Sequence, residues 1–139
     1  MTFTTVNWNT VEDEVDEYVW DKATAQFWRD TRVPVSHDLA TWRTLDAVEK
    51  DVINKAVGGL ALLDTLQSEE GVNVMREDAR TRKEAAVIND FLMMESIHAK
   101  SYGTILISLN DQKTINAVYD WLNNDPRMQY KARVINEIY

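Results

Sequence analysis

The sequence contains no cysteine, only four glycines and two prolines, and no extended apolar run. Without cysteine the chain forms no disulfide, offers no thiolate ligand to a metal and has no catalytic thiol. Because no apolar stretch approaches the ~20 residues of a membrane span, we expect no transmembrane helix. The first ten residues lack a basic segment followed by an apolar one, so they predict no signal peptide. These absences together indicate a soluble, cytoplasmic protein.

Positive charge is also scarce. The sequence has 15 lysines and arginines against 23 aspartates and glutamates, which gives a formal net charge of −8 at pH 7. A negative field of this kind repels the phosphate backbone, so we expect no nucleic-acid partner. An acidic protein can still bind metal cations or a basic protein.

The residues that are present favour an all-α fold. Apolar residues make up 45% of the 139, enough for one packed core. Sparse glycine and proline favour long helices over many short strands. We expect a single helical unit over residues 1–139, with an extended arm over 1–9 and a loop and connector between about 32 and 45. The expected helices cover about 10–28, 46–71, 81–109, 112–123 and 126 onward.

The helix expected over 81–109 carries ionisable groups on its apolar face. At ~100° per residue, Val87 and Ile105 coincide and mark the buried side. Glu95, His98 and Tyr102 all fall within ~80° of them. A buried carboxylate without a partner costs several kcal/mol, and a metal ion removes that cost. Glu-x-x-His at i, i+3 is the recurring ligand unit of carboxylate di-metal bundles.

The preceding long helix supplies one more carboxylate, Asp64, at the edge of its own apolar stripe (Val52, Ala56, Leu60, Leu63 and Gln67). Together Asp64, Glu95 and His98 could hold one ion, and oxygen ligands with one imidazole suit iron or manganese. The alternatives are a surface carboxylate for Asp64, a hydrogen-bonded core histidine for His98, and a packed core residue for Tyr102. The pair Gly58-Gly59 predicts a close contact between helices, with a local distortion near a functional site as the alternative.

Several segments resemble the small, radical-bearing subunit of ribonucleotide reductase, nearest to its class Ib. The main ones are 49–71, which contains GGLALLDTLQSEEG, and 94–102, MESIHAKSY. The segments 7–9 (NWN), 26–28 (QFW) and 33–36 (VPVS) follow in the family's order. Met93, Leu106 and Ile107 depart from the family's usual residues around the second segment. The resemblance spans essentially the whole chain.

The resemblance implies a ferritin-like helical bundle, of which this chain is the N-terminal half, with a di-iron or di-manganese centre. Asp64, Glu95 and His98 match metal ligands of the family. Tyr102 matches the tyrosine that holds the stable radical. Trp28 matches the tryptophan on the radical-transfer path to the large subunit, where ribonucleotides are reduced.

The same family chain is more than twice as long, and its second half carries another carboxylate and a second Glu-x-x-His. We therefore expect an N-terminal fragment of a split ribonucleoside-diphosphate reductase small subunit. Its expected partners are a complementing C-terminal half, a second small-subunit copy, the large subunit and a flavodoxin-like activator. The alternatives are a truncation, a homodimeric ferritin-like metal-binding or oxidase protein, and a non-catalytic remnant.

Overall fold

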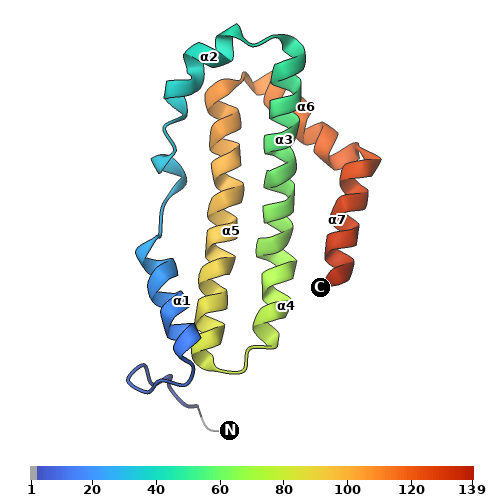
Figure 1. Cartoon of the computed structure of the whole chain (residues 1–139). Helices are drawn as coiled ribbons and strands as arrows, with labels where there is room; N and C mark the ends of the chain where they lie inside the picture. Colours follow the sequence, from blue (N-terminus) through green and yellow to red (C-terminus); the bar gives the residue numbers. More distant parts are fainter. Residues whose placement is uncertain (1–2) are drawn as a thin grey trace.

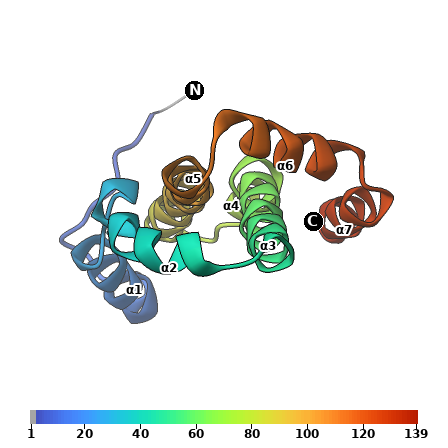
Figure 2. The same ribbon diagram turned by 90° about the horizontal axis from the view of Figure 1, so that it is seen from above.

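The computed structural model describes residues 3–139, and every regular element in this range is helical. Two long helices, α3 (Ala47–Leu66) and α5 (Arg82–Leu109), stand side by side at the centre of the molecule (Figures 1 and 2). The shorter elements are α1 (Glu14–Ala25), η1 (Asp30–Arg32), η2 (Val35–Asp38), α2 (Leu39–Thr44), η3 (Gln67–Gly71), α4 (Val72–Glu77), α6 (Gln112–Asn124) and α7 (Pro126–Ile138).

The helices form a curved layer in the order α1, α5, α3 and α7, as Figure 2 shows from above. Helix α1 packs against α5, and α7 packs against α3, while α6 crosses one end of the central pair. The main core cluster lies at that end and contains Leu106, Ile115, Val118, Leu122 and Met128. None of the helices described between residues 3 and 139 combines the length and apolar character needed to cross a lipid bilayer.

The expected starts of the two central helices are confirmed by their caps. Asp46 caps α3 by accepting from the backbone N–H groups of Val48 and Glu49, and the Glu49 carboxylate accepts from the backbone N–H of Asp46. This reciprocal pair satisfies donors that a helix start leaves free. The Thr81 hydroxyl caps α5 by accepting from the backbone N–H of Glu84.

The pair Gly58-Gly59 gives α3 a close helix contact, as the sequence predicts. A Cβ atom at Gly58 would lie 2.7 Å from Cγ1 of Val118 and 3.0 Å from Cδ1 of Leu122, both on α6. No side chain larger than hydrogen fits there without a shift, so glycine lets α6 approach α3 directly.

The expected boundaries are wrong at two places. Helix α1 begins at Glu14 rather than Thr10, with Asp13 as its N-cap, and ends at Ala25, which leaves Trp28 outside the helix. After Leu66 the chain does not stop at Gly71 but makes a π-helical turn and continues as α4 to Glu77. Gly71, taken as the end of the helix over 46–71, therefore lies in a local distortion of a helical path that continues.

The central pair exposes apolar side chains on its ligand-bearing side. Leu60 is 43% exposed and lies one turn before Asp64, and Phe91 is 40% exposed and lies one turn before Glu95. An apolar stripe is expected to face the core, and for α3 this is wrong at Val52 and Leu60, which are exposed. The buried residues of α3 are Asn54, Gly58, Gly59 and Ala61 instead. This exposed face is where a further helical layer can pack.

Candidate metal centre

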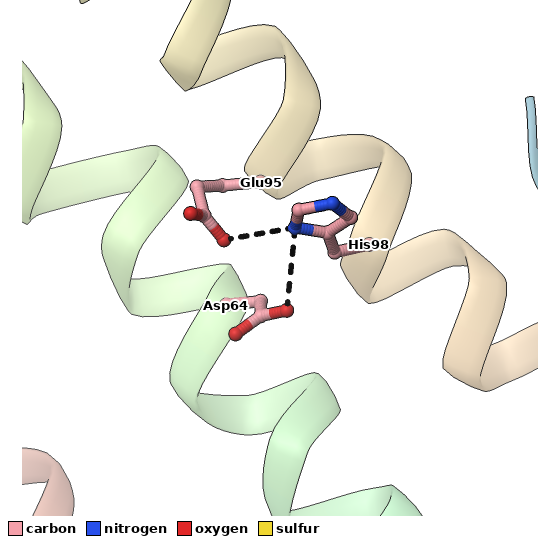
Figure 3. A group of neighbouring side chains, drawn as sticks. All are labelled: Asp64, Glu95 and His98. Atoms are coloured by element: carbon pink, nitrogen blue, oxygen red, sulfur yellow. Dashed lines mark hydrogen bonds and ion pairs between the residues drawn. The ribbon is translucent and has the colours of Figure 1, made fainter. Parts of the chain in front are cut away.

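The three predicted ligands come together where α3 and α5 lie side by side. Asp64 lies in the last turn of α3, while Glu95 and His98 lie one turn apart near the middle of α5. Figure 3 shows the three side chains pointing into the space between the two helices. Because the capped starts of α3 and α5 fix where each helix begins, the three residues meet despite their separation in the sequence.

The distances within this group fit a shared cation. Nδ1 of His98 lies 3.3 Å from Oε2 of Glu95 and 3.9 Å from Oδ2 of Asp64. One candidate ligand atom from each residue lies within 4.8 Å of the others, and among residues 3–139 this is the group of side chains whose spacing could hold a metal ion. The side chains are 18–32% exposed, so the group stays open on one side.

Electrostatics favour a cation at this position. Burial raises the pKa of the Asp64 carboxyl above its usual value, the negative charge of Glu95 raises it further, and His98 opposes the rise. Two carboxylates that face each other are harder to ionise together, and an added positive charge removes that penalty. Carboxylate oxygens with one imidazole nitrogen are donors that iron and manganese accept. The residues therefore fit half of a di-metal site.

Tyr102 lies one helical turn after His98 on α5. Burial raises the pKa of its phenol, and the charges of Asp64 and Glu95 raise it further. The hydroxyl therefore keeps its proton at neutral pH. A cavity of about 280 Å³ lies between Tyr102, His98 and Trp28 and is completed by Val33, Ser101 and Ile105.

Trp28 lies between α1 and η1, in a segment without regular structure. Its indole ring stacks on the His98 imidazole, with the ring centroids 5.6 Å apart and the planes 29° apart. The structure thus brings all five predicted site residues into one neighbourhood. The other histidine, His37, is exposed in η2 and does not belong to the metal-binding group.

The family model of the ribonucleotide reductase small chain matches residues 5–139. The chain belongs to this family. A ribonucleoside-diphosphate reductase beta subunit of Mycobacterium tuberculosis is 40% identical over 134 residues, and the beta subunit of reductase 2 of Escherichia coli is 38% identical over the same length. Each match covers 96% of this chain but only 42% of the relative. The chain therefore spans less than half the length of these relatives.

Solved structures agree with the family and the fold. The dimanganese(II) NrdF protein of Streptococcus sanguinis superposes with a TM-score of 0.96 at 51% identity, over 99% of this chain and 49% of that one. A ribonucleotide reductase R2 subunit of Clostridium botulinum shares the fold with a TM-score of 0.87 at 22% identity, over 97% of this chain. The expected ferritin-like helical fold of a ribonucleotide reductase small subunit is confirmed.

The sequence did not single out Asp30, which lies near the candidate metal centre. Asp30 is only 7% exposed, and its carboxylate bonds to two α5 side chains, Lys100 and Thr104. No local sequence pattern indicates a role for Asp30, because its partners lie 70 or more residues away and Asp30 itself lies outside the expected helices.

Proposed function

We propose that this chain supplies half of the di-metal centre, and the radical tyrosine, of a ribonucleoside-diphosphate reductase small subunit. The observation that carries the proposal is the convergence of Asp64, Glu95 and His98, within 4.8 Å, on the exposed side of α3 and α5. Membership of the ribonucleotide reductase small-chain family supports it. Such subunits serve deoxyribonucleotide synthesis together with a large subunit.

The metal is iron or manganese, in a dinuclear centre completed by residues outside this chain. Carboxylate di-metal bundles use a carboxylate from each of two helices and a Glu-x-x-His pair from each of two others. This chain contributes one carboxylate, Asp64, and one pair, Glu95 and His98. The related S. sanguinis protein is a dimanganese(II) structure, which supports manganese as one of the two candidates.

The missing ligands come, in this proposal, from a complementing C-terminal half. More than half of each relative lies beyond the matched region, and the side chains of Leu60 and Phe91 are exposed on the ligand-bearing face. A second pair of helices on that face would bury these side chains and close the site. A second small-subunit copy, the large subunit and a flavodoxin-like activator are the further proposed partners.

Tyr102 and Trp28 receive redox roles. A bound di-metal centre supplies the oxidising power. Tyr102 lies one turn from His98 and keeps its phenolic proton, so it can lose a proton and an electron together, which a phenyl ring cannot do at an accessible potential. Trp28 stacks on the ring of His98, whose Nδ1 lies near the carboxylates of Glu95 and Asp64. It therefore offers a route for the electron toward the large subunit.

The test is metal uptake by a reassembled subunit. The chain is co-expressed with the C-terminal segment of the S. sanguinis relative that lies beyond the matched half, and the purified complex is analysed for manganese and by native mass spectrometry. We expect a one-to-one complex that binds manganese, and loss of that metal in Glu95→Gln and His98→Ala. Glu77→Gln, on an exposed residue of α4, is the matched control and keeps the metal.

Two outcomes contradict the proposal. If the complex forms and Glu95→Gln with His98→Ala still binds manganese normally, the ligand assignment is wrong. If the chain alone binds two ions per pair of its own copies, it completes the site by self-association, and the complementing half is not its partner.

A further inference from the structure

Trp28 keeps its place on His98 although no helix holds it. It lies in segment 26–29, which runs from the end of α1 to the start of η1. The backbone bonds of this segment are local, such as Phe27 N–H to Thr24 O at 3.4 Å and Arg32 N–H to Arg29 O at 2.8 Å. Local bonds shape the segment but do not attach it to α5, where His98 lies.

The polar contacts between segment 26–34 and α5 come from Asp30. Its Oδ2 accepts a hydrogen bond from the Thr104 hydroxyl at 3.1 Å, and its Oδ1 lies 3.3 Å from Nζ of Lys100. Both partners belong to α5 and lie one turn apart. Among residues 3–139, these are the side-chain hydrogen bonds and ion pairs found between segment 26–34 and any other element.

The two bonds differ in strength. Lys100 is 67% exposed, so its ion pair is screened by water and weak. Thr104 is half-buried beside a carboxylate that is itself 7% exposed. Its Oγ1 also lies 3.1 Å from the backbone oxygen of Lys100, but a charged acceptor binds a hydroxyl more strongly than a carbonyl does. Burial raises the pKa of Asp30, but the bonds to Lys100 and Thr104 and the charge of Lys100 together lower it below its usual value, so the charged acceptor is present at neutral pH.

We propose that Asp30 is a positioning residue, whose bond to Thr104 fixes η1 on α5 and thereby holds the Trp28 indole against His98. Two residues of chain reach at most about 7 Å, so anchoring Asp30 confines Trp28 to a small region beside α5. The proposal deepens the function above, because it explains how an indole outside any helix keeps contact with a metal ligand. It requires no bound metal and no partner.

The test follows the Trp28 ring by NMR. The 139-residue chain is labelled with 5-fluorotryptophan, which gives one resonance for each of its five tryptophans, and Trp28→Phe assigns the Trp28 resonance. His98→Ala then defines the shift caused by losing the stack. We expect Asp30→Ala and Thr104→Val to move the Trp28 resonance toward that value and to remove its Overhauser contact with the His98 ring.

Conservative variants separate positioning from general damage. Lys100→Met keeps the carboxylate that Thr104 binds and should keep the Trp28 resonance near its original position. Asp30→Asn offers Thr104 only a neutral amide oxygen, so its Trp28 resonance should lie between those of the original chain and Asp30→Ala. Asp21→Ala, on an exposed residue of α1, is the matched control and leaves the resonance unchanged. Thr104→Val removes only one hydroxyl from α5, so its Trp28 resonance can still be measured if Asp30→Ala does not fold.

The proposal is overturned if Asp30→Ala or Thr104→Val folds and leaves the Trp28 resonance in place. It is also overturned if the original chain shows no Overhauser contact between Trp28 and His98. Neither result bears on metal uptake, which is measured separately, so failure of this inference is distinguishable from failure of the proposed function.

Discussion

Nδ1 of His98 on α5 lies 3.9 Å from Oδ2 of Asp64 on α3. This contact spans the two central helices, so the geometry of the candidate centre depends on how α3 and α5 pack. Both helices also contact α6 at one end, and the glycine at position 58 sets how closely α6 approaches α3.

Substituting Gly58 should therefore destabilise the fold. The methyl group of Gly58→Ala would lie 2.7 Å from Cγ1 of Val118, and overpacking of this kind costs about 1–3 kcal/mol. Gly103→Ala is the matched control on α5, since its methyl would meet only the Tyr119 hydroxyl at 3.6 Å, an ordinary contact. Removing a helical glycine there should stabilise the chain by about 0.5–1 kcal/mol. Urea unfolding measures both, and equal effects would contradict the packing account.

Asp125, the N-cap of α7, should make the folded chain less stable at low pH. The Arg127 guanidinium, with the backbone N–H of Arg127 and the indole N–H of Trp121, holds the pKa of Asp125 well below its usual range, against the opposing effect of burial. A folded pKa below the unfolded value of about 3.9 gives stability that is complete above that value. It is lost as the pH falls through the lower folded pKa.

We therefore expect the free energy of unfolding to fall below about pH 4, with Asp125 as one contributor. Asp125→Asn keeps an acceptor at the cap but cannot ionise, so the decline should become shallower while stability at pH 7 is lower. Thermal melting from pH 7 to pH 3 measures this. An unchanged acid slope in Asp125→Asn would show that the capping carboxylate is not the titrating group.

The sequence predicted which candidate ligands lie together better than it predicted the helix ends. Glu95 and His98 were found because their i, i+3 spacing lies on the apolar side of a long helix, a pattern that survives small errors in boundary. The start of α1 was misplaced because Thr10, with Asp13 three residues later, resembles a weak capping box. In the folded chain Asp13 is itself the cap and accepts from the backbone N–H of Val15.

Other features of the structure could not be predicted from local sequence patterns. The exposure of Leu60 follows from tight packing at Gly58, which a count of apolar residues cannot register. The π-helical turn 67–71 occurs where Gly71 leaves room for the Tyr139 ring and where the Tyr139 hydroxyl donates to Gln67 at 2.6 Å. The tether from Asp30 to Thr104 joins residues 74 positions apart. Contacts of this length are set by the fold and not by neighbouring residues.

Tyr102→Phe should separate chemistry from packing. The change removes one hydroxyl and keeps the ring, so we expect a stability loss of at most about 1–3 kcal/mol. Metal content of the complemented subunit should be unchanged, while turnover with the large subunit should be lost. Tyr130→Phe, on a residue that is 63% exposed on α7, is the control and should retain turnover. If Tyr102→Phe binds metal and still turns over, Tyr102 does not carry the radical and serves only as a packed core residue.

The central claim is that Asp64, Glu95 and His98 bind one ion of a di-metal centre, and anomalous X-ray scattering from crystals of the manganese-loaded complemented subunit tests it most directly. We expect an anomalous peak within direct coordination distance of a carboxylate oxygen of Asp64, a carboxylate oxygen of Glu95 and Nδ1 of His98. A manganese peak elsewhere, with His98 still bonded only to the two carboxylates, would contradict it.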